Sequence, residues 1–364
     1  MKERNYAIDY LKFFAIFAVI LIHAGPFEEV TLLGVDGYYI DFIIDTLSRF
    51  AVPFFFVTSG YLFGKKMQTA GSNSVYFSGY ISKLSKLFIS WFVFYLLYDF
   101  FVNVTFKSSD LASGRGMIQF MEENINLEVF FYGASTGYQL WYLVALIWSI
   151  FILYIFIHID KLNLLLFISL GLNIFGLFGQ SYSGFFSLPF GTRDAIFFGL
   201  FYTTLGAFAA YNEETIKYKI TGVPTKGWLL LSFLFSILLA VERMVTVFLF
   251  EGEIGDYFLL TIPVTICLFL YALSNPSLGK GSLLTKIGKE SVGIYVIHVF
   301  FIKIIHLLTD VAGVSSMKEH LIWHILFSPV VFLLSYLSYG ILQKIKQRMV
   351  YPTIKRLTIS EWKY

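Results

Sequence analysis

The sequence predicts an all-α, polytopic integral membrane protein with about ten transmembrane helices and with cytoplasmic N- and C-termini. Three observations predict this class. Of the 364 residues, 57% are hydrophobic and only 14% are charged, whereas a soluble domain has about 25% charged residues. The apolar residues fall in runs of bilayer length. Lys and Arg gather in alternate connections between these runs.

The apolar runs define the predicted spans. They lie at about 7–24, 40–63, 80–104, 138–158, 162–180, 193–211, 227–249, 256–274, 290–308 and 321–343. The first run follows basic residues but precedes no small-residue cleavage site, so we expect a retained span and not a removed signal peptide.

The placement of Lys and Arg predicts the orientation. With the N-terminus inside, the cytoplasmic segments hold 19 of these residues and the outer loops hold only Lys107, Arg115 and Lys318, which is the positive-inside bias. Residues 1–345 then form the transmembrane domain, and 346–364 form a basic cytoplasmic tail that we expect to lie on the anionic inner leaflet. The outer stretch 105–137 has room for an amphipathic turn or two but not for an independent core.

The first span carries two ionisable residues, Lys12 and His23. Eleven residues separate them, which on a helix is about 20° past three turns and about 16 Å along the axis, so both leave the same face. Ionisable groups in a span mark functional sites by default. The functional interpretation is a polar path with His23 as a base at neutral pH. The alternative is that Lys12, which Asp9 could pair, snorkels inward while His23 caps the helix before Gly25.

The second span has a charged stripe, because Asp41, Asp45 and Arg49 are spaced at i, i+4 and i+8. Such a stripe must face protein or a watery cavity. It is either a buried Asp45–Arg49 ion pair or the lining of a cavity. Pro53 should kink this helix, and Ser59-Gly60 permits close packing.

Further spans hold fewer polar candidates. Lys83 and Lys86 open the third span on one face, where positive-inside bias explains them, although with Lys12 they could hold a polyanion such as a nucleotide phosphate. In the span 290–308, Tyr295 and His298 share a face with Ser291. They are either a packed, hydrogen-bonded pair or part of a catalytic site. Arg193-Asp194 and Glu242-Arg243 are local charge arrangements or parts of a vestibule for an anionic substrate.

Several site classes find little support. His320 and His324 have the i, i+4 spacing of metal ligands, and His306 could approach them, but the run lacks the glutamate of a zincin motif, so we predict no metal site. The single cysteine, Cys267, excludes a disulfide framework. No phosphate-binding glycine loop or nucleophile elbow is present. The net charge of +3 says little about partners, and we expect no nucleic acid among them.

Five segments together resemble a known family. They are Ile8-Asp9-Tyr10-Leu11-Lys12 with His23, Phe55-Phe56-Val57-Thr58-Ser59-Gly60-Tyr61-Leu62, Arg49-Phe50-Ala51-Val52-Pro53, Leu140-Trp141-Tyr142-Leu143, and Gly293-Ile294-Tyr295-Val296-Ile297-His298. In this order they resemble membrane-bound acyltransferase family 3, which includes O-acetyltransferases of bacterial envelope glycans. The segment that begins at Arg49 is similar to the branch containing the enterobacterial common antigen O-acetyltransferase. The family usually has arginine where this chain has Lys12, an arginine-rich element at Lys83 and Lys86, and histidine at Gln139.

The resemblance implies a function at a bacterial cell (inner) membrane. An acyl group, most often acetyl, passes from cytoplasmic acyl-CoA to a hydroxyl of an extracytoplasmic glycan or lipid-linked sugar, with acyl-CoA as co-substrate and no bound cofactor. The lysines Lys12, Lys83 and Lys86 would hold the donor phosphates. The catalytic residues would be His23, as base or acyl relay, with Arg49 at the oxyanion and His298, while Arg193, Tyr295 and Trp141 would contact substrate.

Two other functions remain open from the sequence. A polysaccharide exporter or flippase could use the same polar channel and would need no acyl-CoA. A small-molecule transporter is a weaker alternative, because no internal repeat and no pair of Gly/Pro-broken helices is visible.

Overall fold

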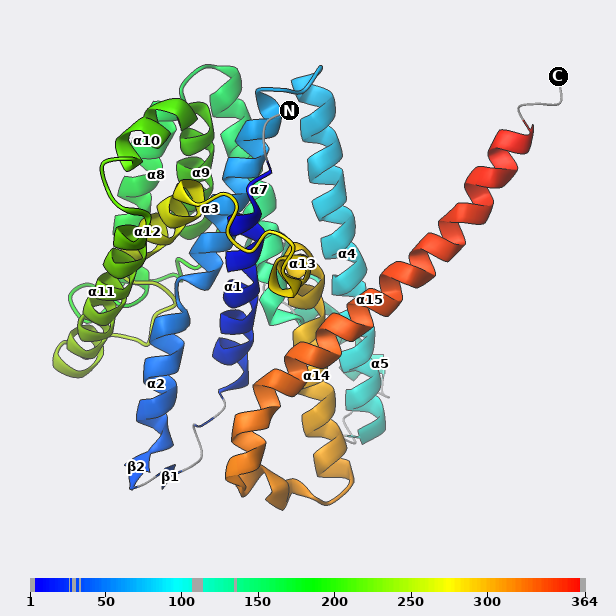
Figure 1. Ribbon diagram of the computed structural model, residues 1–364. Coiled ribbons are helices and arrows are strands. Elements are labelled where there is room, and N and C mark those ends of the chain that lie inside the picture. Colours follow the sequence, from blue (N-terminus) through cyan, green and yellow to red (C-terminus); the bar gives the residue numbers. More distant parts are fainter. Residues whose placement is uncertain are drawn as a thin grey trace.

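The computed structural model describes residues 4–360, apart from 26, 28–30, 33, 107–113, 134 and 135. Helices make up most of the described chain. The only strands in this part are β1 (Thr31–Leu32) and β2 (Val35–Asp36), which pair antiparallel. The predicted all-α class is therefore confirmed, and Figure 1 shows the helices gathered around α1.

The elements follow one another in a simple order. Up to residue 160 the helices are α1 (Tyr6–Ala24), α2 (Gly37–Ser48), α3 (Ala51–Met67), α4 (Asn73–Phe106), α5 (Gly114–Asn124), α6 (Leu127–Tyr132), the 3₁₀ turn η2 (Tyr138–Leu140) and α7 (Trp141–His158). After it come α8 (Leu162–Gly176), η3 (Leu177–Gly179), the π-helical η4 (Ala195–Gly199), α9 (Leu200–Tyr211), α10 (Glu213–Ile220), α11 (Thr225–Met244), the π-helical η5 (Val245–Leu249), α12 (Thr261–Ser274), α13 (Leu283–Lys289), α14 (Ser291–Val311), η6 (Ser315–Glu319) and α15 (Leu321–Ser360).

Seven of the described helices are long and apolar enough to cross a membrane. An eighth span results if η4 and α9 are joined to α10 across a bend of 88°. The predicted run 40–63 is divided into α2 and α3, and the run 256–274 holds only the 14-residue α12. Multi-pass insertion is thus supported, while the count of ten and the orientation stay predictions.

The proline ring of Pro53 explains why α2 and α3 are separate helices. Pro53 has no N–H to donate to the carbonyl of Arg49 four residues earlier, and the two residues Arg49 and Phe50 separate the helices. The chain resumes its hydrogen bonding when Phe54 donates to Phe50 over 2.9 Å. The proline predicted to kink one helix therefore lies in the first turn of a new one.

The closest helix packing joins α3 to α9, which lie side by side in Figure 1. A Cβ atom on Gly60 would lie 1.9 Å from the carbonyl oxygen of Thr203, and one on Gly206 would lie 1.9 Å from that of Val57. Only glycine permits this backbone contact, which is the small-residue packing expected at Gly60. We call the contact the α3–α9 seam.

A second glycine sets the height of α14 against α1. The short helix α13 lies on α1, and a Cβ atom on Gly288 would lie 1.8 Å from the carbonyl oxygen of Asp9 and 2.9 Å from the nitrogen of Phe13. Since α14 follows α13 after one residue, this contact starts α14 near the level of Phe13. His23 and His298 then lie 10 residues beyond Phe13 and 10 beyond Gly288, respectively.

The N-terminus and α10, which the sequence analysis places inside, lie at the opposite end of the bundle from the segments that it places outside. In Figure 1 the N-terminus and α10 are at one end, and β1, β2 and the tip between α14 and α15 are at the other. Helix α15 crosses the bundle and continues away from it past residue 346, where the predicted tail begins. The domain boundary and the membrane contact of the tail stay predictions.

Candidate active site

Two histidines from distant parts of the chain meet inside the bundle. Nδ1 of His23, near the end of α1, lies 2.8 Å from Nε2 of His298 in α14, and the ring centroids are 5.0 Å apart. His298 is fully buried. Helix α1 ends at Ala24, one residue after His23, and Gly25 in the left-handed conformation (φ 47°) is its C-cap. His23 thus bonds to another span and does not cap its own helix.

The hydrogen bonds assign the tautomers of this pair. Nδ1 of His298 lies 2.6 Å from the carbonyl oxygen of Tyr295, an acceptor, so this nitrogen carries the proton. In neutral His298 the other nitrogen, Nε2, must then accept, and His23 donates to it from Nδ1. Nε2 of His23 is therefore the unprotonated nitrogen. The arrangement is a base oriented by a second group, as in other activated-base sites.

Residues on α4 and η2 hold His298 in place. The hydroxyl of Tyr95 donates to the carbonyl oxygen of Val296 over 2.8 Å and accepts from the nitrogen of Phe300 over 3.1 Å. Gln139 donates to the same carbonyl over 3.4 Å, and its own carbonyl accepts from the hydroxyl of Tyr295. The helical turn that carries His298 is therefore held from two sides.

His23 faces a small, partly polar cavity of about 40 Å³. This is space for about three water molecules. The cavity is lined by Val19, Ile22, His23, Arg49, Val52, Trp141, Arg193, Phe198, Asp256 and Tyr295. Its lining residues thus come from six separate segments of the chain.

A network of charged side chains borders the cavity. Arg49 holds Asp45 in a two-pronged contact at 2.7–3.0 Å and reaches Asp256 at 2.6 Å. Arg193 approaches Asp256 at 3.1 Å, and the buried Arg243 pairs with Asp45. Three guanidinium groups against two carboxylates leave one positive charge in excess among these five side chains. The two alternatives for the stripe on the second span therefore both hold, because Arg49 is ion-paired and also lines the cavity.

The carboxylate of Asp256 is charged near neutral pH. Asp256 lies in the loop between η5 and α12, outside the helical spans. Burial alone would raise the pKa of Asp256, but Arg49 and Arg193 outweigh this and hold the pKa below its ordinary value. The ion pairs that shape the cavity therefore persist across the physiological range.

Tethers on the preceding loop position Arg193. The side chain of Thr192 donates to the carbonyl oxygen of Gly176, and Tyr257 donates to Thr192 over 3.2 Å. The next residue, Asp194, caps η4 by accepting from the nitrogen of Phe197 over 2.8 Å. The guanidinium of Arg193 lies 5.2 Å from the ring centroid of Trp141, a cation–π distance.

Six of the nine predicted site residues lie together. His23, Arg49, Trp141, Arg193 and Tyr295 line the cavity, and His298 bonds to His23. Their chemical roles stay predictions.

The three predicted donor lysines lie elsewhere. Lys83 and Lys86 are exposed on α4, and Lys12 is half-buried on α1. None of the three makes an ion pair within 4.0 Å in the part of the chain that is described. Asp9, the expected partner of Lys12, pairs with Arg4 instead.

The outer histidines do not form the helical i, i+4 pair that their spacing suggested. His320 precedes α15 as the C-cap of η6, and only His324 is on the helix. His306 lies among the rings of Trp323 and Phe327. The described residues contain no group of three or more potential ligands placed to hold a metal ion.

Sequence reasoning did not assign roles to three residues of the site. Asp256 was not singled out in the sequence, and Arg243 was considered only together with Glu242, as a local charge arrangement or part of a vestibule. Tyr95 gave no signal, because a tyrosine in an aromatic-rich helix is unremarkable until its partner is known. The buried charge of Arg243 was the one usable indication.

Comparisons with known proteins agree with this arrangement. An acyltransferase-domain family model, that of acyltransferase family 3, matches residues 5–340. Two curated relatives, both titled "Amino-acid racemase" and both from Enterococcus faecalis, are 26% identical to the chain. One alignment covers 95% of this chain and 47% of the relative, and the other covers 74% and 36%. The chain thus spans about half, or less, of the length of these relatives. No solved structure matches.

The matched range contains all six predicted site residues that lie together, including the paired His23 and His298. It does not distinguish among the branches of the family, so the proposed branch stays a prediction. With its model matched over residues 5–340, the chain belongs to the membrane acyltransferase family 3.

Proposed function

We propose that this protein moves an acyl group, most often acetyl, from cytoplasmic acyl-CoA to a hydroxyl of a cell-envelope carbohydrate on the outer side of a bacterial cell membrane. The observation that carries the proposal is the pair His23–His298 beside a cavity with one excess positive charge. A base and a cationic oxyanion site are the two parts that acyl transfer from a thioester requires.

The mechanism begins at Nε2 of His23, which takes the proton of the acceptor hydroxyl. The resulting alkoxide attacks the thioester carbonyl, and the carbonyl oxygen becomes an oxyanion. The excess positive charge of the network around Arg49 and Arg193 stabilises this oxyanion. Collapse of the intermediate breaks the C–S bond, and the leaving thiolate takes the proton back from His23. Ester and free CoA are the products. A variant of this scheme has the acyl group pass through His23 itself.

His298 stabilises the protonated state of His23. When Nε2 of His23 takes a proton, the ring becomes cationic, and its bond from Nδ1 to His298 becomes charge-assisted and stronger. The carbonyl of Tyr295 keeps the proton of His298 on Nδ1, so Nε2 of His298 is available as acceptor throughout.

The donor is proposed to enter from the lysine-rich end. Lys12 lies on the same face of α1 as His23, about 16 Å away along the helix axis. Its charge, with those of Lys83 and Lys86, could attract the phosphates of acyl-CoA while the flexible arm of the donor reaches His23. The racemase titles belong to relatives two to three times as long as the region that matches, and we propose no racemase activity for this chain.

Removing the imidazole tests the proposal. His23→Ala should abolish acylation of the envelope glycan while the protein remains folded and inserted. The readout is mass spectrometry of glycans from a deletion strain complemented with each variant, normalised to inserted protein. Phe14→Ala, an exposed residue on the same helix, is the matched control. Full acylation by His23→Ala would refute the mechanism. Transport of a glycan by purified protein with no CoA-dependent product would favour the exporter alternative.

A further inference from the structure

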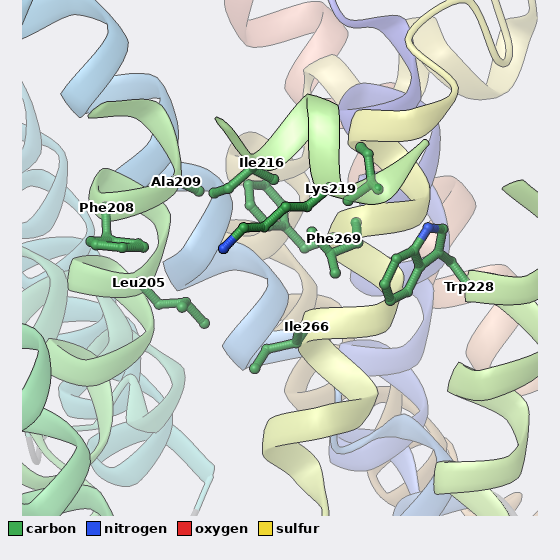
Figure 2. A pocket seen from close by; sticks show the side chains of 10 residues that line it. Leu205, Phe208, Ala209, Ile216, Lys219, Trp228, Ile266 and Phe269 are labelled. Atoms are coloured by element: carbon green, nitrogen blue, oxygen red, sulfur yellow. The ribbon is translucent and has the colours of Figure 1, made fainter. Parts of the chain in front are cut away.

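A second cavity, far from His23, lies between α9, α10, α11 and α12. Its volume is about 270 Å³, and its walls are almost entirely apolar, with Leu205, Phe208, Ile216, Trp228, Ile266 and Phe269 among the lining side chains. Figure 2 shows these residues around the opening. Helix α11 also turns apolar side chains outward, including Leu230 and Phe233, so the cavity opens among surfaces suited to lipid.

One lining residue is charged. Lys219 on α10 extends across the cavity in Figure 2, with its ammonium toward Leu205 and Ala209. Its neighbour Lys217 pairs with Glu213 at 3.0 Å, and Lys65 pairs with the same carboxylate. Lys219 is two residues further along, about 200° around the helix. It makes no ion pair within 4.0 Å with any residue that the structure describes.

The combination specifies the ligand. An apolar cavity takes a hydrocarbon chain, and an uncompensated ammonium at its wall takes an anion, so the ligand has an apolar tail and a negatively charged head. Basic pockets between membrane helices on the cytoplasmic side bind anionic lipid headgroups in this way. The cavity lies at the end of α9 and the start of α11, which is the lysine-rich end of the bundle.

We propose that this cavity binds one acyl chain of an anionic glycerophospholipid, with the lipid phosphate at Nζ of Lys219. The net negative charge of the head gives the preference, because a zwitterionic lipid neutralises its own phosphate. The site is separate from the cavity at His23 and shares no lining residue with it.

Native mass spectrometry of the full chain tests the proposal. The protein is exchanged into nanodiscs with equal amounts of phosphatidylglycerol and phosphatidylcholine, released, and scored for retained lipid. Wild type should retain phosphatidylglycerol in preference. Lys219→Ala should reduce that preference about fivefold, the effect of one lysine near a lipid surface. Ile266→Trp, which fills the cavity, should lower retention of both lipids.

Two control measurements distinguish binding at the proposed lipid site from a general effect of positive charge on lipid retention. Lys217→Ala removes the neighbouring lysine, which already has a partner, and should leave the preference unchanged. Inorganic phosphate added at millimolar concentration should not displace the retained lipid, because it offers no chain to the cavity. Equal retention of the two lipids by wild type, or equal losses in Lys217→Ala and Lys219→Ala, would overturn the proposal.

Discussion

The hydrogen bond between His23 and His298 gives the sharpest prediction. His298→Phe keeps a ring in the buried site but removes the nitrogen that accepts from His23 at 2.8 Å. In the resting state this is a bond between neutral groups. During proton transfer it becomes charge-assisted, and such bonds contribute about 1.5–3 kcal/mol. The resting bond between neutral groups contributes about 0.5–1.5 kcal/mol, so the bond stabilises the transition state by about 1–1.5 kcal/mol more than the resting state. Since about 1.4 kcal/mol is a factor of ten in rate, His298→Phe should lower turnover about 5- to 13-fold.

The loss should fall on turnover and leave donor binding nearly unchanged, because His298 lies behind His23 and does not line the cavity. His298→Gln places an amide oxygen near the position of Nε2 and should recover part of the rate. Glycan acylation per inserted protein in complemented cells measures the overall effect. CoA release by purified protein, at varied acyl-CoA, separates turnover from KM.

The refuting results are specific. Wild-type turnover in His298→Phe would show that His23 needs no orienting partner. A rise in the KM for acyl-CoA at unchanged turnover would place His298 in substrate binding instead. The control Tyr138→Phe keeps the edge-on ring that lies 5.2 Å from His23 and should retain nearly full activity.

The remaining predictions concern positioning and pH. Gly288→Ala puts a methyl group 1.8 Å from the carbonyl oxygen of Asp9, so it should cost about 1–3 kcal/mol of stability and lower activity by shifting α14. The control Gly171→Ala, whose methyl group meets open space, should change neither stability nor activity. Thermal melting measures the stability of both variants, and the acylation assay measures their activity. Asp256→Asn should cost about 1–3 kcal/mol, read from thermal melting in detergent, because it removes the charge that pairs with Arg193 and one of the two that pair with Arg49. Because the folded pKa of Asp256 is depressed, its stabilisation is fully present above the unfolded pKa of about 3.9 and is lost as the pH falls below it. The melting temperature of wild type should therefore fall more steeply than that of Asp256→Asn when the pH is lowered below about 4, and parallel curves would contradict this assignment.

Local spacing predicted the parts of the site that belong to single helices. The shared face of Lys12 and His23, the i, i+4 pair of Asp45 and Arg49, and the close packing at Gly60 all follow from helical geometry. Each depends on residues within a few turns of one another, where 3.6 residues per turn decides the outcome.

The pairings between helices could not be predicted in the same way. His23 and His298 are 275 residues apart, and their meeting depends on the short helix α13 and on the missing side chain of Gly288. Asp256 reaches Arg49 only because a loop folds back between η5 and α12. The lysines failed to join the site for a related reason, since charge at a membrane boundary has a sufficient cause in topology and carries no information about distance to a base.

The α3–α9 seam limits which walls of the cavity at His23 can move. A cavity of about 40 Å³ has room for about three water molecules, so binding of the proposed acyl donor and acceptor together would require its walls to part. Along the seam, backbone meets backbone at Gly60 and Gly206 with no side chain to flex, and packed interiors deform little. The parting would therefore come from other walls of the cavity, such as the loops that carry Arg193 and Asp256. Opening of these loops would leave His23 and His298 paired, because the backbone contact at Gly288 holds the start of α14 against α1.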